Sequence, residues 1–579
     1  MIYSDLCKYY EEIDSTPKRL EKIESISELI SNCEKNLLDK VIFLLQGKVF
    51  PEWDERKLGV ASKIVIKSLS IATGISLDEI EKTWQKTGDL GDSGKTVVEN
   101  KKQQSLFSSE LTISKVFDNL QKLASLEGSG SIDRKIQLIS ELLTSASPLE
   151  AKYIIRTVLG ELRVGASQGT LRESIIKTYF SEIYEKRDSE FNEEYKEILN
   201  LVQNCYDMIN DYSEIVLSLE KYGKQGLEKI SLEVFKPVNP MLFPKAKDIE
   251  DAFRTVGKPA ILEYKYDGFR VQIHKKNEII ELYTRRLENV TTQFPDVVDV
   301  IKKRVKVTEC ILDAEVLGIN KKTKETLPFQ NISQRIRRKY NINETIKNVP
   351  VIIIVFDILK KDNDILIDTP FSTRRKMAQE IITEDEESIV LSTSLETDNA
   401  DEGNKFYQKS LLLGHEGIMV KSLDKGYKPG ARIGYAVKLK PVLEPLDLVI
   451  TRAEWGHGKR TGWFTSFSIG CRDENGNYLD LGKVGTGIKE LENETESPTF
   501  KRFTELLRPL IIKEHNSFAE IKPEIIVEVD YEEIQKSTNY NSGFALRFPR
   551  IKRIRDDLKE PSRIDDVERV YKEQRGRDK

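Results

Sequence analysis

A lysine at the end of one apolar segment has the surroundings of a reactive group. In "ILEYKYDGFR", residues 261–270, Lys265 ends a run that reads as a buried strand, and Asp267, Gly268 and Arg270 follow closely. Taken alone, a strand that ends in a Tyr-Asp-Gly turn, with a lysine extending to solvent, explains the stretch equally well. The rest of the chain must therefore distinguish a surface lysine from a nucleophile.

Six further segments also place charged or aromatic side chains at the ends of apolar strands. They are Arg285 in "LYTRRLENVT", Glu315 in "ILDAEVLG", Phe356 in "VFDIL", Glu416 and Lys421 in "HEGIMVKS", Arg432, Lys438 and Lys440 in "GARIGYAVKLKP", and Arg547, Arg550 and Arg555 in "ALRFPRIKRIRDD". For any one segment alone, a solvated strand end is the simpler interpretation. Together the segments predict one site.

The cations of this set require an anionic ligand. A pocket lined by so many lysines and arginines would repel itself unless a polyanion filled it. Glu315 and Glu416 lie in comparable positions and could hold a Mg²⁺ that is bound to phosphate oxygens. Phe356 could stack on a base. The set predicts a nucleoside triphosphate site, and it is not a P-loop because no GxxxxGK[ST] occurs.

Lys265 then acquires a chemical role in addition to its charge. An ordinary lysine, with a pKa of about 10.4, is protonated at neutral pH and cannot attack. Partial burial among other cations is expected to lower that pKa and free a nucleophile. Its natural target is the α-phosphorus, with pyrophosphate as the leaving group and cations neutralising the developing charge. A covalent lysyl–nucleotide would result.

Three residue patterns along the chain predict the helices and strands that position these residues. Residues 1–232 show apolar positions at three- and four-residue spacing, which is typical of helices. The proline-rich "VFKPVNPMLFPKA" marks a boundary, and residues 233–441 alternate short β-rich runs with helical inserts, which predicts an α+β domain. Residues 442–579 contain short strands separated by Gly and Asn-Gly turns, which favours a small OB-fold barrel.

Composition excludes several classes of protein. The chain has 579 residues, a net charge of −4, and no apolar run long enough to cross a membrane. Its five cysteines (Cys7, Cys33, Cys205, Cys310 and Cys471) form no CxxC pair, which argues against a zinc ribbon or a disulfide framework. We therefore expect a reducing, intracellular location. The net charge does not exclude a nucleic-acid partner, because phosphate recognition depends on local basic faces.

The segment "LRVGASQGT" suits a phosphate contact. It places Arg163 and several backbone N–H groups before a predicted helix N-terminus, an arrangement that binds phosphate. Its glycines fit ordinary helix C-caps equally well. The pattern leaves both interpretations open.

The ordered series of segments resembles the motifs of covalent nucleotidyltransferases, which are DNA ligases, RNA ligases and mRNA capping enzymes. Over nearly the whole chain it is most similar to ATP-dependent DNA ligases of the archaeal and eukaryotic replicative type. The resemblance implies a multidomain protein with an all-α DNA-binding domain, an α+β adenylation domain and an OB-fold domain. It also implies nick sealing in DNA replication, repair and recombination, with a part in cell division. In three steps, the enzyme takes AMP from ATP, passes it to a 5′-phosphate, and lets a 3′-hydroxyl displace it.

The same resemblance implies roles for individual residues. Lys265 would become the N6-adenylated lysine, Glu263 would lie beside the adenine, and Phe356 would stack on it. Arg270 and Arg285 would contact the nucleotide or the 5′-phosphate. Metal would be held by Glu315, which also faces the ribose, and by Glu416. The remaining cations implied to contact phosphates, pyrophosphate or DNA are Arg432, Lys438, Lys440, Arg163, Arg547, Arg550 and Arg555.

Two features depart from the family pattern or allow another interpretation. The last motif commonly reads Arg-x-Asp-Lys, whereas here Arg555 is followed by Asp556, Asp557 and Leu558, with Lys559 one place later. Either Lys559 substitutes, or Arg550 and Arg553 supply the positive charge. In "KKQQSLFSSELT", the residues Gln103, Leu106 and Phe107 resemble a motif that docks on the sliding clamp. An amphipathic helix start with Phe107 in the core explains them equally well.

The resemblance implies ATP as cofactor, with Mg²⁺ or Mn²⁺, and nicked duplex DNA as partner. It implies a monomer without membrane contact, in the cytoplasm if the source is archaeal. The first alternative is an RNA ligase or a GTP-using capping enzyme, against which the large helical N-terminal part argues. A catalytically idle DNA clamp has little need of the paired carboxylates, and an NAD-dependent ligase would carry a Cys₄ zinc site after the barrel.

Overall fold

The structure is a computed structural model of the whole chain. It describes residues 1–579 except 55, 103–109, 129, 189–191, 321, 324, 328, 337–341, 431–433, 442, 457–459, 461, 489–498, 516, 559 and 575–579.

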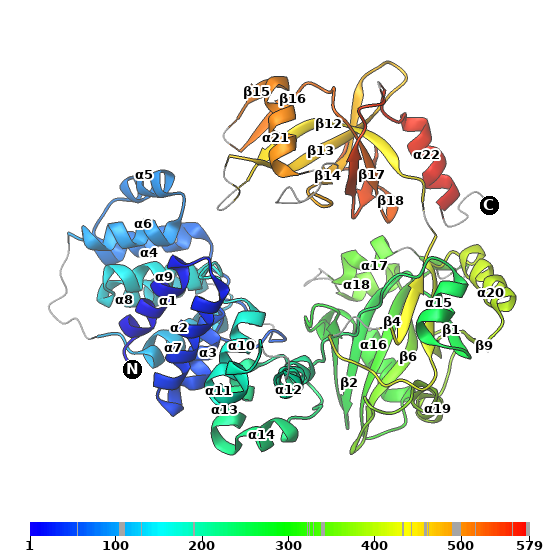
Figure 1. Ribbon diagram of the computed structural model, residues 1–579, viewed down its shortest axis with the longest axis horizontal. Coiled ribbons are helices and arrows are strands. Elements are labelled where there is room, and N and C mark those ends of the chain that lie inside the picture. Colours follow the sequence, from blue (N-terminus) through cyan, green and yellow to red (C-terminus); the bar gives the residue numbers. More distant parts are fainter. Residues whose placement is uncertain are drawn as a thin grey trace. The chain divides into compact units, whose positions relative to one another are not determined.

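The first part of the chain is helical, as its apolar periodicity predicts (Figure 1). Its elements are α1 Tyr3–Ser15, α2 Arg19–Asn32, η1 Lys35–Leu37, α3 Leu38–Leu45, α4 Ser62–Thr73, α5 Leu77–Thr87, α6 Leu90–Glu99, α7 Ile113–Ser125, α8 Ser131–Ser145, α9 Pro148–Val158, α10 Gln168–Tyr179, α11 Ser181–Glu185, α12 Glu193–Ile209, α13 Tyr212–Tyr222 and α14 Lys224–Lys229. Side-chain caps define several of these ends. Ser147 and Glu150 form a capping box at the start of α9, where Pro148 occupies the first turn.

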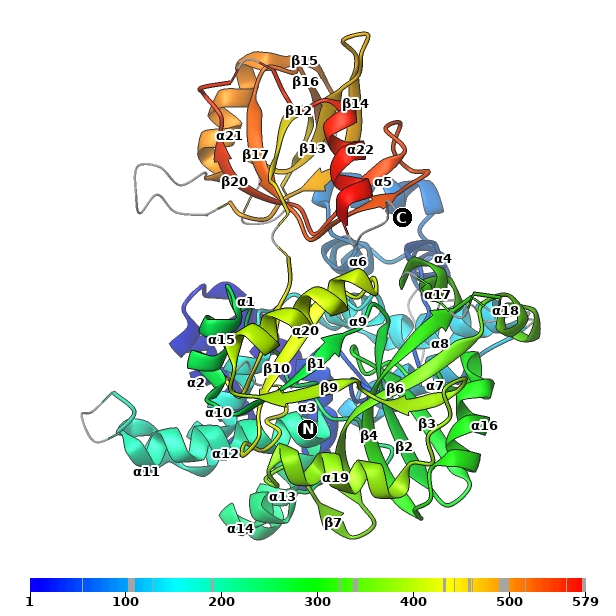
Figure 2. The ribbon, with the colours of Figure 1, turned by 90° about the vertical axis from the view of Figure 1, so that its right-hand side faces the viewer.

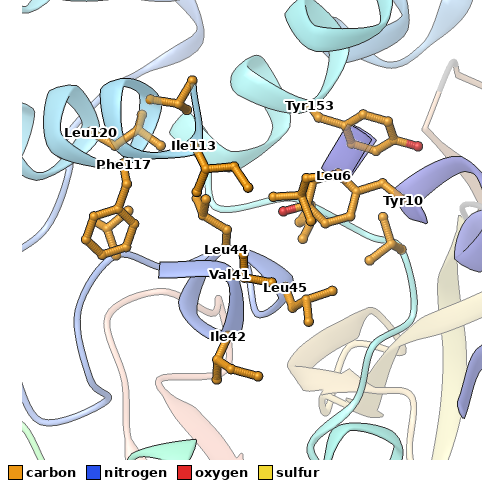
Figure 3. Close-up of a cluster of buried hydrophobic side chains, with 14 of the residues drawn as sticks. Leu6, Tyr10, Val41, Ile42, Leu44, Leu45, Ile113, Phe117, Leu120 and Tyr153 are labelled. Atoms are coloured by element: carbon orange, nitrogen blue, oxygen red, sulfur yellow. The ribbon is translucent and has the colours of Figure 1, made fainter. Parts of the chain in front are cut away.

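Several of these helices share one apolar core. Figure 3 shows side chains from α1, α3, α7 and α9 that meet there, and all of those labelled are buried. Tyr10 and Tyr153 lie with ring centroids 4.8 Å apart. The core residues of α1 recur every three or four positions, so one stripe of the helix faces inward.

A first sheet has the strand order β3-β2-β4-β6-β7 (Figure 2). Its strands are β2 Phe269–Lys276, β3 Ile279–Thr284, β4 Glu309–Ile319, β6 Val351–Lys361 and β7 Asp364–Ile365, joined by β5 Thr326–Leu327 and β8 Ile389–Leu391. The associated helices are η2 Thr291–Gln293, α16 Pro295–Arg304, α17 Phe329–Ile336, α18 Ile342–Asn348 and α19 Phe371–Ile381. Helices α16 and α19 bury their apolar stripes on one face of this sheet, with Val271, Leu312 and Val355. We call it the arginine sheet, because its other face carries Arg270.

A second sheet has the order β11-β10-β1-β9. Its strands are β1 Ala260–Lys265, β9 Ser394–Thr397, β10 Gly417–Ser422 and β11 Ala436–Leu439, with helices α15 Ile249–Val256 and α20 Ala400–Leu412. All described pairings in it are antiparallel. Apolar side chains of α15 and α20 pack on one face. We call it the lysine sheet, because its other face carries Lys265.

The C-terminal part is rich in strands, as predicted. Its elements are β12 Leu446–Trp455, β13 Phe464–Arg472, β14 Tyr478–Val484, α21 Phe500–Leu507, η4 Arg508–Leu510, β15 Ile511–Glu514, β16 Phe518–Ile521, β17 Ile526–Asp530, β18 Glu533–Lys536, β19 Phe544–Arg547, β20 Arg550–Ile554 and α22 Ile564–Glu573. Strand β12 pairs with β13, β16 and β17, and β17 pairs in turn with β20. These strands and the apolar stripes of α21 and α22 surround one core, which contains Phe467, Phe503 and Val567.

The structure confirms the predicted order of a helical part, a mixed part and a strand-rich part. The charged C-terminal segment forms α22, which ends at Glu573. Among the described residues, no helix combines the length and apolar character that a bilayer crossing requires.

A buried ion pair anchors α19 to the arginine sheet and gives a first prediction. Arg374 donates to both Asp357 oxygens, at 2.7 and 2.9 Å, and the two side chains are only 3% and 6% exposed. Arg374→Met leaves the Asp357 carboxylate buried without its counter-ion, and we expect it to lower the free energy of unfolding by about 3–5 kcal/mol.

Denaturant titration measures this change. Lys376→Met alters an exposed cation on the same helix and should change the free energy of unfolding by less than about 0.5 kcal/mol. Equal effects of the two substitutions would contradict the assignment.

Candidate active site

The predicted site residues are distributed over two compact units of the chain. The first unit holds residues 1–243, 268–392 and 423–433, and the second holds residues 244–267, 393–422 and 434–579. Lys265 belongs to the second unit, and Arg270 belongs to the first. The chain passes from one unit to the other at the Asp267–Gly268 turn.

The pleat of the lysine sheet gathers its charged residues on one face. Successive side chains of a strand point to opposite sides of a sheet. Leu262 and Tyr264 of β1 pack in the core that α15 and α20 cover, so Glu263 and Lys265 lie on the opposite face. The same alternation on β10 and β11 buries the apolar residues Ile418, Val420, Val437 and Leu439 in that core. It therefore turns Lys421 and Lys438 to the face of Lys265.

Glu416 joins two lysines of this face. Its Oε2 lies 2.7 Å from the Nζ of Lys265 and 2.6 Å from the Nζ of Lys440. Burial alone would raise the pKa of Glu416, but the two ammonium groups outweigh it and hold that pKa well below its usual range. The backbone N–H of Glu416 donates to the carbonyl of Lys265 at 2.8 Å, which fixes the two residues side by side. The three side chains carry a net positive charge.

Gly417 provides the close approach of strands beside this group. It pairs with Lys265 across β1 and β10, and its φ is +135°. A Cβ at this position would lie 2.2 Å from the carbonyl oxygen of Leu439 on β11. Only glycine fits this position, so its place after Glu416 in the sequence has a structural reason.

Glu263 forms a second, more deeply buried ion pair on the lysine sheet. Its carboxylate lies 2.5 Å from the Nζ of Lys421, and the two side chains are 2% and 9% exposed. The sequence predicts that Glu263 lies beside an adenine. In the structure its carboxylate forms an ion pair with Lys421, a partner that the sequence did not predict.

The guanidinium of Arg270 forms hydrogen bonds with other groups of the protein on the polar face of the arginine sheet. It donates to both oxygens of Asp313, at 2.9 and 2.5 Å, and to the carbonyl of Met241 and the hydroxyl of Tyr427, each at 2.9 Å. Its side chain is 14% exposed and that of Asp313 is fully buried. The predicted contact of Arg270 with a nucleotide or 5′-phosphate stays a prediction.

Glu315 and Phe356 lie near Arg270 for two different reasons. Glu315 is the direct cross-strand partner of Arg270 on β4. The pairing of β4 with β6 steps from Val355 to Asp357, and Phe356 is the extra residue of a β-bulge. The ring of Phe356 lies 5.6 Å from the guanidinium of Arg270. The structure thus brings together three residues that the sequence predicts for one nucleotide site.

Two residues that bond Arg270 have no role assigned from the sequence. Asp313 stands in "ILDAEVLG", two positions before Glu315, as a charged strand-end residue without a role of its own. Tyr427 stands in "GYKPGAR", a few positions before Arg432. A tyrosine close to a Pro-Gly turn could have indicated a partner of Arg270. The same residue pattern also occurs in ordinary surface turns, so it does not identify such a partner.

The other predicted residues lie at the surface or in ion pairs. Arg285 is exposed just after β3. Arg163 is exposed, has a φ of +57° and donates to Glu161 at 2.5 Å. Arg555 is held by Asp447 and Asp557 at 2.8 Å each, Arg547 lies 3.4 Å from Glu533, and Arg550 is exposed. Arg432, Lys559, Gln103, Leu106 and Phe107 lie outside the described residues.

The Glu263–Lys421 pair gives a second prediction. Glu263→Gln keeps the side-chain size but leaves the Lys421 ammonium buried without its charge partner, and we expect a loss of about 3–5 kcal/mol in unfolding free energy. Adding Lys421→Met should restore part of that loss. A double-mutant cycle from urea unfolding should give a coupling free energy of about 1–3 kcal/mol, and additive effects would contradict the pair.

Comparison with known proteins places the chain in a family. A family model described as "ATP dependent DNA ligase domain" matches residues 240–440. Models described as "DNA ligase N terminus" and "ATP dependent DNA ligase C terminal region" match residues 2–176 and 460–558.

Full-length relatives agree with these matches. A "DNA ligase" of Nanoarchaeum equitans (strain Kin4-M) is 44% identical over 100% of this chain and 99% of its own length. A "DNA ligase" of Thermococcus fumicolans is 41% identical over 98% of both chains. A solved structure described as "Pmar-Lig_Pre." has the same fold, with a TM-score of 0.58 at 17% identity over 95% of this chain and 99% of that chain. The chain belongs to the ATP-dependent DNA ligase family.

Proposed function

We propose that the protein seals nicks in duplex DNA with ATP, through a lysyl-AMP at Lys265 and an adenylated 5′-phosphate. The observation that carries this proposal is the ion-paired group of Lys265, Glu416 and Lys440 on one face of the lysine sheet. Family membership supports the same reaction, because the relatives named above are DNA ligases over their full length.

The group explains how Lys265 is held and how it is released. Before a ligand binds, the Glu416 carboxylate holds the Nζ of Lys265, and Lys440 contacts the same carboxylate. An arriving triphosphate offers both ammonium groups further anionic oxygens, so it competes with Glu416 for them. Lys265 must lose a proton before it attacks. A bond then forms between its Nζ and the α-phosphorus, and the bond from that phosphorus to pyrophosphate breaks.

We assign the remaining nucleotide contacts as the sequence predicts them. Phe356 stacks on the adenine, Glu263 lies beside it, and Glu315 faces the ribose. Phosphate charge is neutralised by Lys438, Lys440 and Arg432, and by Arg270 or Arg285. The support is that each sheet gathers its own predicted residues on one face, and that the chain runs directly from Lys265 through Asp267 to Arg270.

A divalent cation fits the donor set as a companion of the nucleotide. We assign Glu416 and Glu315 as its protein ligands. Among the described residues no group of three or more His, Cys, Asp or Glu side chains could hold a metal ion by itself. Mg²⁺ commonly takes one or two carboxylates and completes its shell with phosphate oxygens and water. When bound, it would neutralise charge that develops on the phosphates.

DNA contacts are assigned to the helical and C-terminal parts. We propose that Arg163, Arg547, Arg550 and Arg555 contact DNA or orient pyrophosphate. We further propose that the domains end at residues 232 and 441 and that the protein acts as a monomer. We also propose that it takes part in DNA replication, repair and recombination and in the cell cycle. We propose an intracellular location, and we propose that Gln103, Leu106 and Phe107 dock on the sliding clamp.

Labelling with ATP in the absence of DNA tests the central claim and is our third prediction. With [α-³²P]ATP and Mg²⁺, the wild-type chain should retain label on denaturing gels and transfer it to nicked duplex DNA. Lys265→Arg preserves the positive charge beside Glu416 but removes the nucleophilic amine, and we expect labelling to fall at least a thousandfold, about 4 kcal/mol in the barrier.

Controls separate the alternatives. Lys276→Arg changes an exposed lysine of β2 and should label as the wild type does. Labelling with GTP and discharge to nicked RNA, without discharge to DNA, would favour an RNA-directed enzyme. Label that persists in Lys265→Arg would exclude Lys265 as the nucleophile.

A further inference from the structure

One tyrosine hydroxyl joins four segments of the first unit. The Tyr427 hydroxyl accepts from the backbone N–H of Met241 at 3.0 Å and from Arg270 at 2.9 Å, and it donates to Asp313 at 3.2 Å. Tyr427 is only 2% exposed. These partners belong to β2, to β4 and to residues 230–243 after α14, which we call the linker. The tyrosine itself belongs to the loop of residues 423–430, which we call the strap.

The other end of the strap lies against α12 of the helical part. Gly430 donates its N–H to the carbonyl of Asn239 at 3.0 Å, and Asn239 donates to the backbone and the side chain of Asp207, at 2.9 and 3.0 Å. The φ of Gly430 is +67°, and a Cβ there would lie 2.4 Å from a carboxylate oxygen of Asp207. The contact with α12 therefore requires glycine.

The strap joins its two contacts through a short segment with few free torsions. Only Lys428 and Pro429 separate Tyr427 from Gly430. Three residue steps span at most about 11 Å, and the proline ring fixes its own φ. We therefore expect a shift of α12 relative to β2 and β4 to act on the Tyr427 hydroxyl and its partners.

Side chains of β2 fix the linker that shares this hydroxyl. Gln272 bonds both the N–H and the carbonyl of Val238, at 2.9 and 2.5 Å. His274 accepts the N–H of Phe235 at 2.9 Å, and burial lowers the pKa of His274 to about 3, which keeps the ring neutral and able to accept. Arg270, Gln272 and His274 alternate along β2, so one face of the strand holds the linker in place.

We propose that Tyr427 is a positioning residue that couples α12 of the helical part to Arg270 and Asp313 on the arginine sheet. This inference rests on the proposed function. Lys265, Glu416 and Lys440 belong to the second unit, whereas the hydrogen bonds described for Tyr427 are made within the first. We therefore expect formation of lysyl-AMP without DNA to depend on the coupling less than the steps that need the helical part engaged on DNA.

Two substitutions in the full chain test the coupling and form our fourth prediction. Tyr427→Phe removes one oxygen and keeps the ring. Gly430→Ala forces the strap away from Asp207. For both we expect labelling by [α-³²P]ATP to slow by a smaller factor than discharge, because Arg270 is the only assigned nucleotide contact that Tyr427 bonds among the described hydrogen bonds. We expect discharge of that label to nicked duplex DNA, followed in single turnover at saturating DNA, to slow at least tenfold.

A matched tyrosine provides the control. The Tyr283 hydroxyl also bonds the linker, at the carbonyl of Phe235 and 3.0 Å away, and it too is 2% exposed. It does not belong to the strap. Tyr283→Phe should therefore leave both labelling and discharge within about twofold of wild type. Equal slowing of labelling and discharge, or no slowing of discharge in either strap variant, would overturn the inference.

Hydrogen exchange gives a readout that does not depend on chemistry. Nicked duplex DNA should slow exchange of the Met241 and Gly430 amides in the wild type, and should do so much less in Tyr427→Phe. Unchanged protection in that variant contradicts the coupling. If the wild-type chain is not labelled by ATP at all, the proposed function is overturned. The hydrogen-exchange measurement would still decide whether the strap responds to DNA. If Tyr427→Phe does not fold, Gly430→Ala decides by the same measurements.

Discussion

A single carboxylate shared by two ammonium groups organises the reactive end of the lysine sheet. The Glu416 carboxylate lies between the ammonium groups of Lys265 and Lys440, and Lys440 also lies 3.5 Å from the carboxylate of Glu532. Because like charges close together are costly unless an anion lies between them, the two lysines can share a face only while Glu416 stays ionised. The two cations hold the pKa of this buried carboxylate low, which keeps it ionised.

Two sheets with one apolar and one polar face each supply the scaffold for such groups. The lysine sheet buries alternate residues beneath α15 and α20, and the arginine sheet buries them beneath α16 and α19. The polar faces are rich in buried charge, and nearly every such charge described above has a partner of opposite sign or a backbone carbonyl. Pairs such as Arg374–Asp357 and Glu263–Lys421 show why this is needed, since an unpaired buried charge is strongly destabilising.

Much of the fold and part of the site could be predicted from the sequence. The three- and four-residue spacing of apolar residues indicated the helical part, and the short β-rich runs indicated β1, β4, β6, β10 and β11 because strand periodicity is a local property. The grouping of Lys265 with Glu416 and Lys440 followed from their common position at strand ends. The inward engagement of Arg270 could not be predicted, because its partners Met241, Asp313 and Tyr427 come from distant segments.

The sequence by itself determined the order of the three parts, the family, and the residue types that carry the chemistry, because motif spacing and periodicity are written along the chain. Only the tertiary structure decided which charge neutralises which. Lys421 forms an ion pair with Glu263, and Arg555 forms one with Asp447. The hydroxyl of Tyr427 joins four segments through hydrogen bonds. These choices depend on strand register, on the bulge at Phe356 and on the close approaches at Gly417 and Gly430. Each is a contact between segments remote in sequence, and its energy appears only when the chain has folded.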